Sequence, residues 1–81
     1  MRIRRTPQFT RTYDLAPAQI QKAFDWKVSL LVQNLRHPSL RAKKYDEARD
    51  IWQARVNGGW RFYFSMEGDT YILHSLRPHP K

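Results

Sequence analysis

The sequence of 81 residues contains no cysteine. Disulfide bonds and thiolate metal sites are therefore excluded as supports of the fold. A chain without cysteine suits a reducing compartment, and we expect a cytoplasmic protein. We expect neither a bound metal ion nor a small-molecule cofactor.

Long apolar runs and repeats are also missing. No stretch approaches the roughly 18 apolar residues that a membrane-spanning helix needs. The N-terminus has no signal-peptide hydrophobic region. At this length we expect one domain, residues 1–81. Such a chain buries only about 60–65% of its unfolded surface, so its stability margin is small.

Acidic residues are scarce. Seven Asp and Glu stand against fifteen Lys and Arg, which gives a net charge of +8. Residues 1–13 hold four arginines and no acidic residue, and further basic clusters lie at 41–44 and 77–81. This balance favours a polyanionic partner, namely nucleic acid, an acidic protein or an anionic membrane. The alternative is a basic surface that serves only solubility.

The first half of the chain predicts a short strand and helices. Residues 3–6 predict a strand, and residues 8–15 a weak helical turn. Residues 18–35 predict an amphipathic helix, because apolar residues recur at three- and four-residue steps. The members of this stripe are Ile20, Phe24, Val28, Leu31 and Leu35. His37-Pro38 ends the helix, since the residue before proline avoids helical angles.

Residues 39–50 predict a polar connection, which Leu40 and Tyr45 anchor. Residues 51–64, "IWQARVNGGWRFYF", then predict a β-hairpin. Apolar and polar residues alternate on both sides of an Asn-Gly-Gly turn, which tolerates positive φ. One face of this hairpin is apolar, and the other carries Arg55 and Arg61.

The second half continues as sheet. Residues 66–70 predict a turn and residues 71–77 a last strand. The predicted fold class is α+β: a short N-terminal strand, two helices, and a three-strand antiparallel meander with the helices on one face. The opposite face is predicted to be open and basic.

Four segments of the chain form a recognisable pattern: "FTRTYDLAPAQIQKAF" (9–24), "LRHPSLRAKKY" (35–45), "IWQARVNGGWRFYF" (51–64) and "YILHSLRPHPK" (71–81). In this order they resemble the RelE/ParE superfamily of toxins from toxin–antitoxin systems. Together they cover nearly the whole chain. The resemblance implies one of two activities. RelE-like toxins cleave mRNA, usually in the ribosomal A site, whereas ParE-like toxins inhibit DNA gyrase and are not nucleases.

The resemblance also implies partners. An acidic antitoxin segment holds both kinds of toxin inactive. For the RelE-like branch the expected partners are a cognate acidic antitoxin, mRNA and the ribosome, with no membrane partner.

RelE-like cleavage implies a catalytic set. The reaction needs no metal: the 2′-hydroxyl attacks the adjacent phosphate, and cations stabilise the charge that develops. Arg61 matches the phosphate-contacting arginine of the nuclease branch, and Arg55 matches a position that is Lys or Arg there. His79 matches the histidine after the last strand and is the expected general acid or base. Gln53 stands where some relatives carry another lysine.

Each assignment has a structural alternative. Arg61 can pair with Glu67 or Asp69, Arg55 can be a solvated strand residue, and His79 can be a loose terminal histidine. By strand alternation His74 is expected in sheet packing or at an edge, and His37 as a helix cap.

A wider RNA-binding surface is expected around this set. Tyr63 is the expected base-stacking residue, because Trp52 and Trp60 fall on the apolar, core-facing side of the hairpin. The residues expected to contact phosphates are Arg41, Lys43, Lys44, Arg77 and Lys81. We expect an mRNA endonuclease; the alternatives are a ParE-like gyrase inhibitor, a catalytically inactive RelE-fold binding module, and a basic RNA-binding module that does not cleave.

Overall fold

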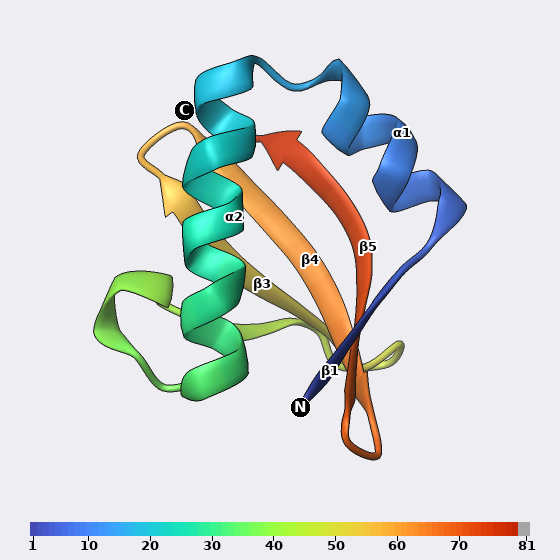
Figure 1. Ribbon diagram of the computed structural model, residues 1–81. Coiled ribbons are helices and arrows are strands. Elements are labelled where there is room, and N and C mark those ends of the chain that lie inside the picture. Colours follow the sequence, from blue (N-terminus) through green and yellow to red (C-terminus); the bar gives the residue numbers. More distant parts are fainter. Residues whose placement is uncertain (80–81) are drawn as a thin grey trace.

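A computed structural model describes residues 1–79 of the chain (Figure 1). The elements in chain order are β1 (Arg2–Arg5), α1 (Pro7–Leu15), α2 (Ala18–Gln33), the 3-10 turn η1 (Pro38–Leu40), β2 (Lys43–Asp46), β3 (Ile51–Asn57), β4 (Trp60–Glu67) and β5 (Thr70–Pro78). The strands form one five-stranded sheet in the order β1-β5-β4-β3-β2. β1 runs parallel to β5, and the other neighbours are antiparallel. The predicted α+β class is confirmed.

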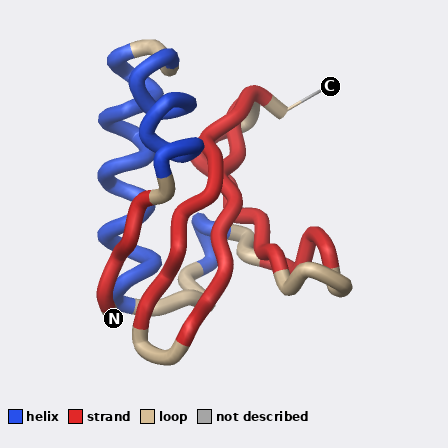
Figure 2. Tube along the Cα trace, turned by 90° about the vertical axis from the view of Figure 1, so that its right-hand side faces the viewer, coloured by secondary structure: helices blue, strands red, loops and turns tan. Residues whose placement is uncertain are grey.

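The two helices lie on the same side of the sheet, and the other face is left open (Figure 2). Phe9 of α1, Phe24 of α2 and Phe62 of β4 are fully buried between these layers. Their ring centroids lie 5.2 Å (Phe9–Phe24) and 5.1 Å (Phe24–Phe62) apart. The apolar side of the predicted hairpin therefore faces the helices, as the alternation of its residues indicates.

Short polar contacts define where the helices begin and end. The Thr6 hydroxyl accepts a hydrogen bond from the Phe9 amide at 3.1 Å, which caps α1. The same hydroxyl donates to the Leu73 carbonyl at 2.9 Å, so the cap is also tied to β5. Beyond α2, His37 Nδ1 accepts from the Ser39 amide at 3.2 Å, which confirms its predicted capping role at η1.

The prediction of a polar connection over residues 39–50 is wrong. This segment contains η1 and the edge strand β2, which extends the three-strand meander by one strand. The sequence of β2, "KKYD", shows no apolar alternation, because β2 lies at the edge of the sheet and none of its side chains is fully buried. Leu40 is fully buried as expected, but Tyr45 is 59% exposed and does not anchor the segment in the core.

β5 contains an irregularity that strand alternation does not predict. Tyr63 of β4 pairs with Ser75, yet its neighbour Phe64 pairs with Leu73. His74 is therefore an extra residue in β5, as in a β-bulge, and a bulge redirects the side chains around it. His74 and Ser75 consequently line the same pocket although they are adjacent in sequence.

Within residues 1–79, no helix is both long enough and apolar enough to cross a membrane.

Candidate functional site

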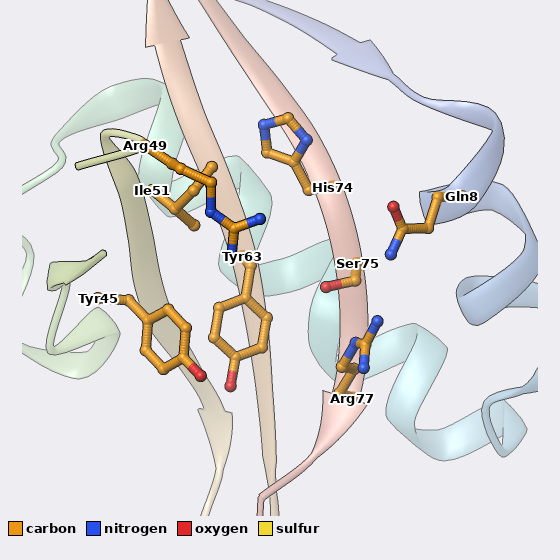
Figure 3. Close-up of a pocket in the computed structure, with 8 residues that line it drawn as sticks. All are labelled: Gln8, Tyr45, Arg49, Ile51, Tyr63, His74, Ser75 and Arg77. Carbon is orange, nitrogen blue, oxygen red and sulfur yellow. The ribbon is translucent and has the colours of Figure 1, made fainter. Parts of the chain in front are cut away.

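The open face of the sheet carries a pocket of about 340 Å³ (Figure 3). Its lining comes from α1, from every strand between β2 and β5, and from the β2–β3 turn. The lining residues are Gln8, Tyr45, Arg49, Ile51, Tyr63, His74, Ser75 and Arg77. They include two arginines and a histidine but no carboxylate. Such a lining suits an anionic ligand.

Two tyrosines stand side by side in this pocket. The rings of Tyr45 and Tyr63 have centroids 4.9 Å apart and planes inclined at 64°. Burial, together with nearby Tyr45, raises the pKa of Tyr63 above its usual value, although Arg77 and Arg61 act in the opposite direction. The Tyr63 hydroxyl therefore stays protonated at neutral pH and is a hydrogen-bond donor.

His74 is held in the pocket by a polar contact. Its Nε2 lies 2.8 Å from the Ser65 hydroxyl. Partial burial, and secondarily the positive charge of Arg4, lower the pKa of His74 below its usual value. The imidazole is therefore neutral at physiological pH and able to accept a proton.

Three arginines form a row across the sheet beside the pocket. Arg55 of β3 pairs in register with Arg61 of β4, and Arg61 pairs with Arg77 of β5. Arg77 is exposed and lines the pocket. Arg61 does not pair with an acid on β4 or its turn: its Nη1 donates to the carbonyls of Asn57 at 2.6 Å and Trp60 at 2.9 Å.

The residues predicted to be catalytic meet at the β3–β4 turn. Arg61 Nη1 donates to the Asn57 carbonyl there. The Arg55 side chain lies over Gly58: a Cβ atom added to this glycine would be 3.7 Å from Arg55 Nη2. The backbone amide of His79 donates to the Gly59 carbonyl at 2.8 Å. The structure thus brings Arg55, Arg61 and His79 to one end of the sheet. His79 is not among the residues that line the pocket.

The remaining predicted phosphate contacts are scattered. Lys44 forms ion pairs with Asp50 and, at 4.0 Å, with Glu47, so acids already neutralise it. Lys43 is exposed on β2. Arg41 is exposed and lines a second pocket of about 180 Å³ behind η1. Lys81 lies outside the described residues.

Of the eight residues that line the pocket, the sequence predicts only Tyr63 and Arg77 as site residues. Strand alternation predicts His74 in sheet packing or at an edge, because the bulge that redirects it has no sequence signal. Tyr45 is expected to anchor the 39–50 connection, since the sequence pattern does not predict β2. Arg49 lies in the β2–β3 turn, where its Nε donates to Asp46 at 2.8 Å. The β4–β5 turn, in contrast, is predicted at residues 66–70, and its Gly68 has φ +60°, a value that glycine adopts without strain.

Metal ligands are not grouped in the described part of the chain. Residues 1–79 contain no cluster of three or more His, Cys, Asp or Glu side chains that could hold a metal ion.

Comparison with solved structures places this fold among toxins. The chain matches a YoeB/ParE toxin from Agrobacterium tumefaciens with a TM-score of 0.81 at 13% identity, over 99% of this chain and 100% of the other. It matches a YoeB–YefM toxin–antitoxin complex from Staphylococcus aureus with a TM-score of 0.78 at 14% identity, over 99% and 98%. It matches a RelB–RelE antitoxin–toxin complex from Methanococcus jannaschii with a TM-score of 0.74 at 19% identity, over 93% and 88%.

The sequence itself matches no protein-family model and no curated protein. The structural matches show that the chain has the fold of the YoeB, YafQ and RelE toxins over nearly its whole length. The predicted resemblance to the RelE/ParE superfamily is confirmed at the level of the fold.

Proposed function

We propose that this protein is the toxin of a toxin–antitoxin pair and a metal-independent endoribonuclease that cleaves mRNA on the ribosome, in the cytoplasm. The observation that carries the proposal is the pocket on the open face of the sheet, which has arginine, histidine and tyrosine side chains but no carboxylate. The toxin fold that surrounds this pocket supports the same function.

The proposed reaction is an in-line transfer within the RNA. A base takes the proton of the 2′-hydroxyl, and the resulting oxygen attacks the neighbouring phosphorus. The bond from phosphorus to the 5′-oxygen breaks, and an acid gives that oxygen a proton. The products are a 2′,3′-cyclic phosphate and a 5′-hydroxyl. Positioned proton transfer typically contributes about 10²–10⁴-fold.

The arginine row is proposed to stabilise the charged phosphorane. Arg61 and Arg55 lie at the β3–β4 turn, and Arg77 extends the row into the pocket. Guanidinium groups suit this role because they bind two phosphate oxygens at once. His79 is proposed to transfer the proton, and neutral His74 is a second group able to do so.

The proposed protein partner is an acidic antitoxin segment that covers the basic face. Similar toxins are described in complexes with antitoxins, YoeB with YefM and RelE with RelB. A net charge of +8 favours an acidic partner, because complementary charge speeds association and selects against wrong partners.

Cleavage mapping of mRNA in a cell-free translation reaction tests the nuclease. We expect discrete, codon-phased cuts with the wild-type chain and their loss, by at least about a hundredfold, in Arg61→Ala. His79→Ala and His74→Ala, measured in parallel, identify the histidine that transfers the proton. Lys22→Ala is the matched control, because Lys22 is an exposed cation on α2, on the other side of the sheet. Intact mRNA in the presence of wild-type protein would rule the nuclease out.

A second candidate function is ParE-like inhibition of DNA gyrase, or binding without chemistry in a RelE-type fold. Gln53 favours it, because this residue is 9% exposed and supplies no cation where some nucleases of the family carry lysine. A gyrase supercoiling assay separates the candidates: inhibition together with intact mRNA would establish the second.

A further inference from the structure

Tyr45 is an exposed aromatic residue in a position that the core does not explain. Its side chain is 59% exposed on the edge strand β2, and its ring packs only against Tyr63 among the aromatic pairs of the described residues. A single exposed aromatic is ordinary on a protein surface. Tyr45 differs because its ring lines a pocket that also holds the side chains of Arg49 and Arg77.

The geometry of the tyrosine pair limits how a flat ligand can bind. With planes inclined at 64°, the two rings cannot both lie parallel to one inserted base. A planar ligand must therefore stack on the exposed face of a single ring. Tyr45 is the ring with exposed surface, whereas Tyr63 is half-buried and supports Tyr45 from the side. A tyrosine loses little conformational entropy on binding, so it suits this role.

Hydrogen-bond donors flank the pair. In Figure 3 both tyrosine hydroxyls point away from Arg49. The Asp46 carboxylate accepts from Arg49 Nε at 2.8 Å and from its backbone amide at 3.2 Å, which holds the side chain in place. This ion pair is neutral overall, so Arg49 contributes directed N–H donors. Arg77 has no acidic partner among residues 1–79 and contributes the net charge.

We propose that Tyr45, supported by Tyr63, is a stacking platform for one unpaired nucleobase of RNA, and that Arg77 and Arg49 contact the phosphates on either side of that nucleotide. Base stacking on a lone aromatic ring tolerates any base, so the platform positions the strand without reading its sequence. The choice of RNA as the ligand rests on the proposed nuclease function; the stacking geometry does not.

A binding experiment that needs no catalysis tests the platform. The probe is a short fluorescent single-stranded oligonucleotide with 2′-O-methyl groups, which cannot be cleaved by 2′-hydroxyl attack. We expect Tyr45→Ala to weaken its binding about tenfold and Tyr45→Phe to change it by less than about twofold, because stacking uses the ring and not the hydroxyl. Anisotropy titrations at one fixed salt concentration measure both.

Trp26→Ala is the matched control. Trp26 is 63% exposed on α2, on the opposite side of the sheet, and its removal should leave binding unchanged. Thermal unfolding of each variant shows that it is folded, and truncation of the exposed Tyr45 ring should leave the unfolding temperature within about 2 °C.

The outcomes separate this inference from the nuclease proposal. Tyr45-dependent binding by a protein that leaves mRNA intact would sustain the platform and reject the nuclease. Cleavage of mRNA together with wild-type binding by Tyr45→Ala would reject the platform and sustain the nuclease. The platform is also rejected if the wild-type protein does not bind the oligonucleotide.

Discussion

At the scale of single residues, His74 is the most informative side chain of the open face. Partial burial disfavours its charged form, and the positive charge of Arg4 adds to this effect, so its pKa lies below the usual 6.5. Below pH 6.5 an unfolded chain binds a proton at His74 more readily than the folded protein does. His74 therefore lowers the free energy of unfolding as the pH falls from 6.5 toward its native pKa.

Removal of the Arg4 charge should raise the pKa of His74. We expect the His74 ring signals of Arg4→Ala to titrate at higher pH than those of the wild-type protein, as measured by NMR of the imidazole ring. Arg11→Ala is the control, because Arg11 is an exposed cation on α1 that is not among the charges acting on His74. An identical His74 titration in Arg4→Ala and wild type would show that burial alone lowers the pKa.

The same scale shows which site residues were predictable. The alternation of β4 predicts Tyr63, and the basic end of β5 predicts Arg77, as RNA-binding residues, and both line the pocket. His74 was not predictable as a site residue, because one inserted residue in β5 reverses the alternation locally. No residue type marks that insertion in advance.

At the scale of elements, α1 completes the hydrogen bonding of β5. β1 pairs with β5 only from Thr70 to Leu73. Beyond that point the buried Leu76 amide donates to the Thr12 hydroxyl of α1 at 3.0 Å, and this hydroxyl donates to the Phe9 carbonyl at 2.8 Å. A helix side chain thus replaces a strand neighbour, since a buried backbone amide needs a partner.

Loss of the Thr12 hydroxyl should destabilise this junction. We expect Thr12→Val, which keeps the shape of the side chain, to lower the free energy of unfolding by about 1–3 kcal/mol, because it leaves the Leu76 amide without a partner. Urea denaturation followed by tryptophan fluorescence measures the change.

Thr10→Val is the control for that experiment. Thr10 is exposed on α1, and its replacement should change stability by no more than about 0.5 kcal/mol. Equal stability of the two variants would mean that water or a backbone shift satisfies the Leu76 amide.

At the scale of the whole molecule, charge and architecture act together. The helices cover one face of the sheet, and the open face carries the arginine row and the pocket. Not every cation contributes equally, because Lys44 and Arg49 are paired with acids of their own segment. The net charge of +8 is therefore a guide to the class of partner and not to the number of phosphates bound.

The salt dependence of RNA binding should report those contacts. For the 2′-O-methyl oligonucleotide, we expect log K to fall linearly with log salt concentration, and Arg77→Gln to reduce the slope by about 0.7, the value for one phosphate contact on a single strand. Lys22→Gln, on the helix side, should leave the slope unchanged. Equal slopes for Arg77→Gln and wild type would show that Arg77 does not contact a phosphate.

The sequence by itself determined the α+β class, the long helix, the hairpin and the basic open face. These follow from local periodicity, turn residues and charge, which act between residues close in the chain. Only the tertiary structure decided that residues 43–46 form an edge strand, that His74 enters the pocket, and that Tyr45 meets Tyr63. Each of these features depends on contacts between segments that are distant in the chain. The residues of one segment alone do not determine those contacts.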